Sequence, residues 1–180
     1  MGAVQEEIDS KLANWLMEQQ MFFVATAPLD KNGFVNCSPK GLDSFRVLAP
    51  KRVAYLDLHG SGVETIAHVR ENARIVLMFC AFSGPPKIVR LHGEAKCYGL
   101  NSPEFATLST QFPDVPGGRS IFEIDVKRVS VSCGFGVPRF DFVSERTALP
   151  DWAQSKGTAG LQQYRADHSE SINEMDANID

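Results

Sequence analysis

The chain has 180 residues, of which 43% are hydrophobic and 22% charged, and its formal net charge at pH 7 is −4. This length fits one domain with appendages that buries most of its apolar surface on folding. The acidic balance argues against a nucleic-acid partner, which calls for a basic excess, and the longest apolar run, Ile75 to Phe82, is far shorter than the roughly 20 residues that span a bilayer.

The predicted elements start with a short amphipathic helix. Ile8, Leu12 and Leu16 recur at helical spacing, and Asp9 or Ser10 is placed to cap the start.

Strands dominate the middle of the chain. An Asn-Gly pair at residues 32–33 separates two runs of strand-forming residues and predicts a β-hairpin. Gly, Pro and Asn punctuate the later candidates. The predicted strands cover residues 21–27, 34–38, 45–48, 52–58, 74–82, 87–98 and 121–133. Many short antiparallel strands with few helices favour an α+β, mainly β fold, either a barrel or a sandwich.

Three further helices are predicted, over residues 61–71, 103–111 and 147–165. The last residues hold four carboxylates among few apolar groups, so they cannot bury enough surface to offset the entropy of ordering. We therefore predict one domain over residues 1–166, which includes the C-terminal helix, and a flexible acidic tail over residues 167–180.

A strand runs through glycines into a helix at residues 56–65. Such a junction directs unpaired backbone N–H groups and the positive end of a helix to one place, which stabilises a phosphate. A second interpretation needs no ligand, because Ser61 and Glu64 have the Ser-x-x-Glu spacing of a capping box. The sequence leaves both open.

The second candidate segment is the strand end Asn36-Cys37-Ser38-Pro39-Lys40-Gly41. Pro39 lacks an N–H donor and interrupts a regular ladder, so Lys40 places a cation where the strand stops. A cation there suits an anionic ligand or a reduced flavin ring. The alternative is a solvated lysine on an edge strand.

Two more segments allow either a ligand or a structural role. Period-two alternation groups Arg90, His92 and Glu94 on one face of a strand, which turns toward a ligand or toward solvent. The glycines of Cys133-Gly134-Phe135-Gly136 permit close approach of another surface, or they only shape a tight turn.

Neither a metal site nor a catalytic residue is predicted. The four histidines form no His-x-x-His or His-Glu-x-x-His motif, and His59 and His68 are expected at the surface or in helix caps. The four cysteines are widely spaced without a Cys-x-x-Cys pair, and the start of the chain lacks the layout of a secretory signal. We expect reduced thiols and a cytoplasmic location.

Seven short segments occur in a specific order, namely Ser38-Pro39-Lys40-Gly41, Tyr55-Leu56-Asp57, Gly60-Ser61-Gly62-x-Glu64-Thr65, His68-x-x-Glu71-Asn72, Met78-Phe79-Cys80-Ala81-Phe82, Gly84-Pro85-Pro86 and Cys133-Gly134-Phe135-Gly136-Val137-Pro138. In this order they resemble the pyridoxamine 5′-phosphate oxidase-related FMN-binding proteins, a family of short split-barrel chains. The resemblance runs from about Asp9 to Tyr164, and the joint match is far more specific than any single segment.

The resemblance implies a six-stranded antiparallel split β-barrel with flanking helices, which forms a homodimer with FMN between the protomers. It places the phosphate at residues 61–65, the flavin ring along residues 36–41 and Arg90 beside the ring, with residues 133–138 of the partner completing the site. The implied FMN-binding residues are Asn36, Cys37, Ser38, Pro39, Lys40, Gly41, Asp57, Ser61, Gly62, Glu64, Thr65, Arg90, Cys133, Gly134, Phe135 and Gly136.

The sequence also departs from the oxidases that give the family its name. Gly62 and Val63 stand where those enzymes have an Arg-Lys pair on the phosphate loop, and Arg165 and His168 lack the spacing of their Arg-x-His substrate element. We therefore predict an FMN-binding oxidoreductase that acts on an unknown small molecule other than pyridoxamine phosphate. Two alternatives stay open: a non-catalytic carrier of flavin or haem, and a barrel whose cofactor site has decayed.

Overall fold

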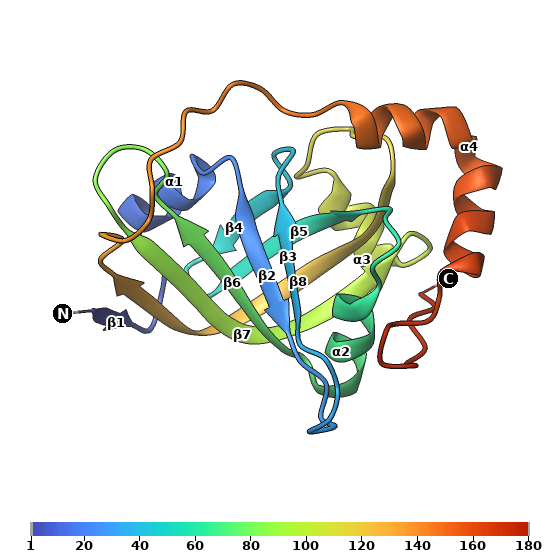
Figure 1. The fold of residues 1–180 in the computed structure, drawn as a ribbon, viewed down its shortest axis with the longest axis horizontal. Coiled ribbons are helices and arrows are strands. Elements are labelled where there is room, and N and C mark those ends of the chain that lie inside the picture. The colour runs from blue at the N-terminus through green and yellow to red at the C-terminus, as the bar shows by residue number, and fades with distance from the viewer. Residues whose placement is uncertain (1, 180) are drawn as a thin grey trace.

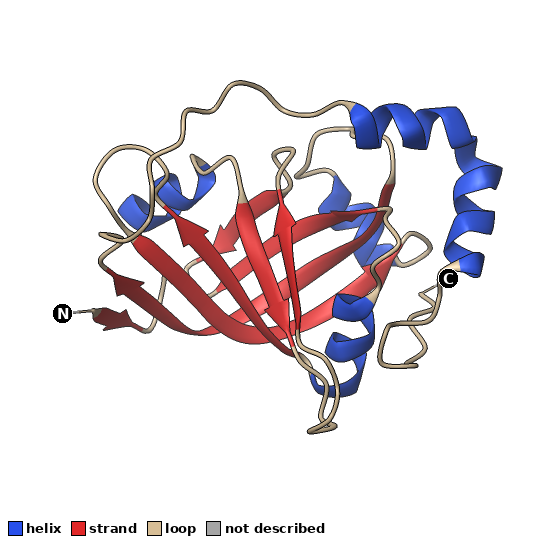
Figure 2. Ribbon diagram, in the orientation of Figure 1, coloured by secondary structure: helices blue, strands red, loops and turns tan. Residues whose placement is uncertain are grey.

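The computed structural model describes residues 2–179, which form one antiparallel sheet flanked by four helices (Figures 1 and 2). The strands are β1 (Ala3–Gln5), β2 (Phe22–Thr26), β3 (Asn36–Lys40), β4 (Phe45–Ala49), β5 (Arg52–Leu58), β6 (Arg74–Cys80), β7 (Ile88–Gly99) and β8 (Gly118–Ser132). The helices are α1 (Ser10–Met17), α2 (Glu64–Asn72), α3 (Pro103–Ser109) and α4 (Ala148–Asp167). Within residues 2–179 no helix combines the length and the apolar character needed to cross a membrane.

Neighbouring strands follow the order β3-β2-β6-β7-β8-β5-β4, so the sheet has β3 and β4 at its two ends and is open in its hydrogen bonding. The long strands β7 and β8 curl, and β3 comes to lie across from β5 (Figure 1). The antiparallel, mainly β fold with flanking helices is confirmed.

The strand number differs from the prediction, because the described residues form eight strands rather than six. One of the two additional strands, β1, has a geometric origin in the 15-residue strand β8. Its first half pairs with β5 on one edge, which leaves the second half of that edge open, and β1 fills it with Ala3 opposite Val131. An exposed strand edge is a row of unpaired donors and acceptors, and β1 satisfies part of it.

Side-chain caps mark where two of the described helices, α1 and α3, start. The carboxylate of Asp9 accepts from the N–H of Leu12 at 2.7 Å and starts α1, as predicted. The Ser102 hydroxyl accepts from the N–H of Phe105 at 3.1 Å and starts α3. Helix α4 is broken in the middle at Gly157, whose φ of 63° and ψ of 175° lie outside the helical region.

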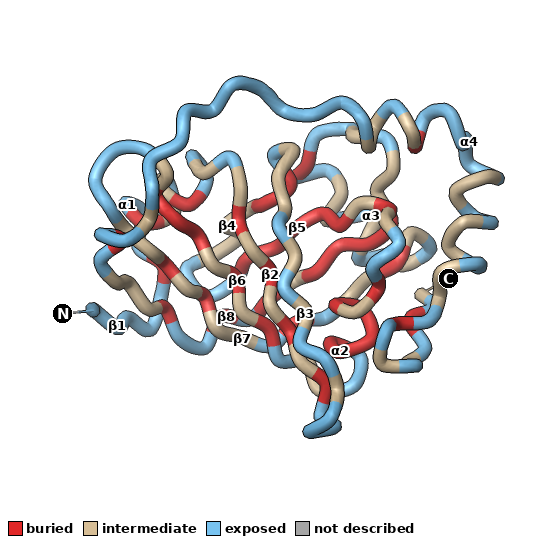
Figure 3. Tube along the Cα trace, in the orientation of Figure 1, coloured by how far each residue is buried: buried red, intermediate tan, exposed pale blue. Residues whose placement is uncertain are grey.

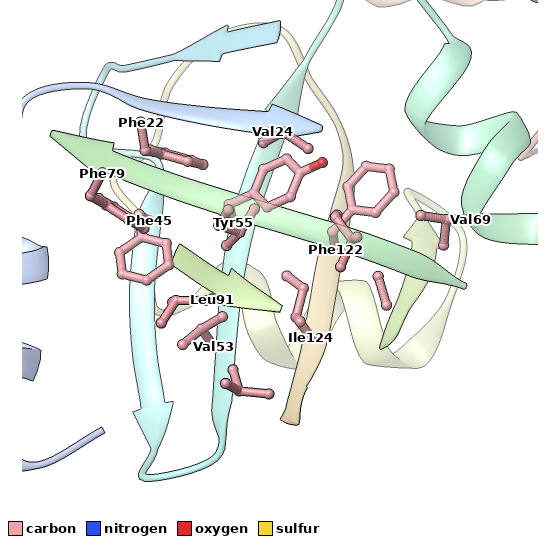
Figure 4. Close-up of a cluster of buried hydrophobic side chains, with 14 of the residues drawn as sticks. Phe22, Val24, Phe45, Val53, Tyr55, Val69, Phe79, Leu91, Phe122 and Ile124 are labelled. Atoms are coloured by element: carbon pink, nitrogen blue, oxygen red, sulfur yellow. The ribbon is translucent and has the colours of Figure 1, made fainter. Parts of the chain in front are cut away.

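Aromatic and aliphatic side chains together fill the barrel interior (Figure 4). Phe22 stacks on Phe79 with ring centroids 5.3 Å apart, and Tyr55 stacks on Phe122 at 4.9 Å. Phe45 joins the cluster edge-on to Phe79 at 4.9 Å. Each of the buried phenylalanines contributes about 1.5–3 kcal/mol through its removal from water. This core fixes the positions of β2, β4, β5, β6 and β8, which carry these residues.

The chain after β8 runs around the outside of the sheet. Residues 133–147, which we call the strap, pass over one end of the sheet to α4, and α4 leads to a C-terminal segment beside α2 (Figure 1). The strap is almost wholly exposed (Figure 3). In the C-terminal segment Ala177 is 4% exposed and belongs to the main core cluster. The structure thus places this stretch of the acidic tail against the barrel, and its flexibility stays a prediction.

His68 of α2 is fully buried and links α2 to the C-terminal segment, so the prediction of a surface or capping role for it was wrong. The Asn173 amide oxygen accepts from the N–H of Phe34, and its nitrogen donates to Phe34 O at 3.1 Å and to His68 Nε2 at 2.9 Å. His68 Nε2 is therefore the acceptor, which leaves the proton on Nδ1 to donate to the Thr26 hydroxyl at 3.0 Å. The network requires a neutral imidazole.

We predict that stability falls as the pH drops below about 6.5, the ordinary pKa of histidine in an unfolded chain. Burial lowers the pKa of His68 in the folded protein, despite the opposing charges of Glu64 and Glu71. The unfolded state then binds more protons in this window, so the stability present above it is lost as the pH decreases. Urea unfolding at pH 7 and pH 5.5 should show a smaller loss for His68→Gln than for the wild type. Equal losses in both proteins would contradict this.

Candidate functional site

A pocket of about 320 Å³ opens where the end of β3, the loop from β5 to α2 and the start of β8 meet. Small-molecule sites occupy about 300–1,000 Å³, so the pocket lies at the lower end of that range. It is lined by Ser38, Pro39, Lys40, Gly41, Leu42, Ser44, Leu56, Leu58, His59, Gly60, Ser61, Gly62, Arg119 and Leu149.

Two cations of this pocket share one buried carboxylate. Asp57, which is 1% exposed, accepts from Lys40 Nζ and from Arg119 Nε, each at 2.6 Å. Burial alone raises the pKa of this carboxyl, but the charges of Lys40 and Arg119 outweigh that effect and hold its pKa below the ordinary value. Asp57 is thus an anion with two cationic partners, and the three groups together carry a net charge of +1.

Arg119 also fixes the backbone of the loop that leads into α2. Its Nη1 donates to Gly60 O at 3.0 Å and its Nη2 to Gly62 O at 2.6 Å. The N–H of a trans peptide points opposite to its C=O, and the described residues contain no cis peptide bond. The N–H groups of Ser61 and Val63 therefore point away from the guanidinium. Arg119 sets the orientation of the amides at the entry to α2.

The capping-box interpretation of Ser61 and Glu64 is wrong. The N-cap of α2 is Val63, and no side chain accepts a hydrogen bond from the first turn. The Glu64 carboxylate instead accepts from the N–H of Ile172 at 3.3 Å. The amides at the start of α2 are thus free of side-chain caps within residues 2–179, which leaves them able to bind an anion.

The structure brings most of the predicted residues of β3 and of the loop together. Ser38, Pro39, Lys40, Gly41, Ser61 and Gly62 line one pocket, and Asp57 lies beneath it. Asn36 and Thr65 flank this pocket, since the Asn36 amide donates to the Thr65 hydroxyl at 3.0 Å and accepts from the Ser38 hydroxyl at 3.1 Å.

Other predicted residues lie elsewhere in the single chain. Arg90 sits on the face of β7 opposite the core and donates to the Ser132 hydroxyl at 3.3 Å. Cys37 is exposed on β3. Residues 133–136 follow β8 and do not line the pocket, and Gly134 lies so close to Lys87 that an added Cβ would be 2.7 Å from its backbone nitrogen. That close approach explains the glycine without any ligand.

Comparisons with known proteins agree on one family. Residues 8–133 match the family model for pyridoxamine 5'-phosphate oxidase. The chain is 41% identical over 145 residues to the pyridoxamine 5'-phosphate oxidase family protein ustO of Aspergillus flavus, a match that covers 78% of this chain and 58% of that protein. The chain belongs to the pyridoxamine 5'-phosphate oxidase family. It spans less than two thirds of the length of this curated relative.

Solved structures share the fold of this family member. HupZ of Group A Streptococcus superimposes with a TM-score of 0.51 at 20% sequence identity, over 67% of this chain and 91% of that one. A pyridoxamine 5'-phosphate oxidase candidate of Lactobacillus delbrueckii does so with a TM-score of 0.51 at 18% identity, over 69% and 94% of the two chains. At these identities the likeness concerns the fold alone.

Two residues of this family member were missed by the sequence analysis. Arg119 is the extra residue of a β-bulge, because Asp57 pairs with Ser120 while the next residue, Leu58, pairs with Gly118. Bulges turn a side chain out of the regular alternation, which is why periodicity gave no sign of it. The second is His59, which the sequence placed wrongly at the surface or in a cap, although it is 1% exposed.

His59 is held as a neutral ring. Arg165 Nη1 lies 3.1 Å from His59 Nε2, and a guanidinium can only donate, so Nε2 accepts and Nδ1–H donates to Gly117 O at 2.7 Å. Burial is the main cause that lowers the pKa of His59, and the charges of Arg165 and Arg119 lower it further.

Residues 2–179 contain no group of three or more metal-ligating side chains.

We predict that Asp57→Asn lowers the free energy of unfolding by about 3–5 kcal/mol, because it leaves Arg119 buried beside Lys40 without a counter-charge. The matched control is Asp43→Asn, which removes an exposed carboxylate from its pair with Arg46 and should cost below about 1 kcal/mol. Asn also tolerates the φ of 51° at position 43. Chemical denaturation measures both. Equal losses would show that the Asp57 cluster contributes no more than a surface pair.

Proposed function

We propose that this chain is a flavin-dependent oxidoreductase that binds FMN with its phosphate at Ser61–Thr65 and its ring along β3. The observation that carries the proposal is the pocket in which the end of β3, the uncapped start of α2 and the Arg119–Asp57–Lys40 cluster meet.

The residues present fit the phosphate end of such a cofactor. The cluster carries a net positive charge, and the entry to α2 presents backbone N–H groups with no side-chain cap. This loop has Gly62 and Val63 where the oxidases have an Arg-Lys pair, and Arg119 from β8 lies behind the loop amides as a buried cation that orients them. An anion is stabilised by oriented amides together with a nearby cation.

The bound flavin would supply the electron transfer, and the protein would supply position and electrostatics. Lys40, the last residue of β3, is a cation on the strand along which the ring is proposed to lie. Asp57 fixes its ammonium at 2.6 Å. In this role Lys40 stabilises the negative charge that a flavin ring acquires on reduction.

The carrier alternative remains open for flavin and for haem. The rings of His59 and His68 use both nitrogens in hydrogen bonds within the chain, so a haem ligand among the three candidates would be His92, which is half-buried on β7. A flavin that binds but is not reduced by nicotinamide cofactors would favour the carrier.

The FMN proposal is tested by titrating the protein with FMN and following the quenching of flavin fluorescence. We expect one FMN per chain. Arg119→Lys should weaken binding roughly tenfold or more, because lysine keeps the charge beside Asp57 but cannot hold both Gly60 and Gly62. The matched control, Arg46→Lys, should bind like the wild type. A protein that takes up no flavin from excess FMN would refute the proposal.

We also propose that the chain forms a homodimer through the outer face of β3, β2, β6 and β7. Cys37 and Pro39 are exposed there, and Phe23, Met78 and Arg90 form a half-buried row across neighbouring strands. Arg90 and residues 133–136 do not reach the pocket of their own chain, and this pairing would let a partner chain contribute to the site.

Sedimentation equilibrium should therefore give a mass of twice 19.8 kDa. Cys37→Glu places a charge on the proposed interface and should produce monomers, since an unpaired buried charge is costly. Val35→Glu, at a position 71% exposed on the loop between β2 and β3, serves as the control and should leave the dimer intact. A monomeric wild type would exclude this arrangement.

A further inference from the structure

A second and larger pocket, of about 540 Å³, lies on the other side of the end of β3. The two pockets share Pro39, Lys40, Gly41, Leu42 and Leu149 in their linings, so they are neighbours separated by one short stretch of chain. The volume suits a compound of drug-like size.

Aromatic side chains from two parts of the chain line this second pocket. Phe82 follows β6, while Phe140 and Phe142 belong to the strap. The strap is attached here by the N–H of Phe140, which donates to Phe82 O at 3.0 Å, and by the two rings, whose centroids are 5.4 Å apart. Phe140 and Phe142 nevertheless remain 61% and 56% exposed. Large aromatic rings exposed around a hollow leave their faces available to a ring-shaped ligand.

The charges of the lining argue against an anionic ligand. The pocket lining contains two carboxylates, Asp141 and Glu145, and two cations, Arg146 and Lys40, so its formal charges balance. No excess of positive charge is left for a carboxylate or phosphate on the ligand. The phosphate-binding features all lie in the first pocket, at Arg119 and the entry to α2.

We propose that the second pocket is the substrate site and takes an uncharged, planar aromatic compound between Phe82, Phe140 and Phe142. This inference rests on the proposed function, because it makes the end of β3 the wall between cofactor and substrate. Lys40 and Gly41 then border both, which places the aromatic compound next to the proposed ring position. The strap, through its two phenylalanines, selects the substrate class.

The test uses N-phenyl-1-naphthylamine, an uncharged probe that fluoresces in apolar surroundings, and its sulfonated analogue 8-anilino-1-naphthalenesulfonate. We expect saturable binding of the uncharged probe at one site per chain, about tenfold tighter than that of the analogue. Phe142→Ala should weaken it roughly tenfold, because a ring contact and its buried area are lost. Val143→Ala, at an adjacent position that is 90% exposed and outside the pocket lining, is the matched control and should change nothing.

FMN titration of the same proteins separates this inference from the proposed function. The uncharged probe should still bind to protein saturated with FMN, and Phe142→Ala should keep the wild-type affinity for FMN. Displacement of the probe by FMN would overturn the inference, because the second pocket would then belong to the cofactor. Tighter binding of the sulfonated analogue, or equal effects of Phe142→Ala and Val143→Ala, would also overturn it. A protein that binds the probe but no FMN would refute the proposed function alone.

Discussion

Asp57 is a carboxylate with 1% exposed surface, and a carboxylate in that position is stable as an anion only where cations replace the water it has lost. Lys40 comes from one end of the open sheet and Arg119 from β8, so this single ion cluster joins β3, β5 and β8. No hydrogen-bonded pairing connects β3 to β5 within residues 2–179. The ion cluster therefore joins β3 to β5 across the split, beside the contacts of the aromatic core, and leaves one uncompensated positive charge at the pocket.

The β-bulge at Arg119 places one side chain in contact with both the buried Asp57 and the loop that leads into α2. The register shift between β5 and β8 takes Arg119 out of the regular alternation of side chains along β8. Regular strand pairing would not by itself account for the contacts of Arg119 with Gly60 and Gly62. The bulge directs the guanidinium to Asp57 and to both carbonyls at once. Bulges next to functional sites commonly re-aim a side chain in this way. Three hydrogen bonds of one residue thus fix the cluster and orient the loop amides.

The sequence predicted the local features of the fold and the site, but not the β-bulge that directs Arg119 into the pocket. Alternating and apolar runs gave the strands β2 and β5 to β8, and the spacing around Asp9 gave α1, because periodicity and capping are local properties. The Ser38–Gly41 and Ser61–Gly62 halves of the site were also accessible, since each is a local motif. Arg119 was not, because it lies 62 residues from Asp57 and a one-residue shift in register decides its direction. His59 and His68 were misplaced for a related reason: polarity suggests the surface, whereas their hydrogen-bond partners are distant in sequence.

The two pockets differ in how firmly their walls are held. The walls of the first are tied by the ion pairs of Asp57 and by the bonds of Arg119, and His59 is fixed on both ring nitrogens. The strap wall of the second is exposed along most of its length and is attached near the pocket by one backbone hydrogen bond and one ring contact. Segments with few buried contacts open at low free-energy cost, and ligand-binding loops are drawn from them. In the proposed arrangement the firmly held first pocket would retain the cofactor, and the loosely attached strap would be the wall that moves when a substrate enters or leaves the second pocket.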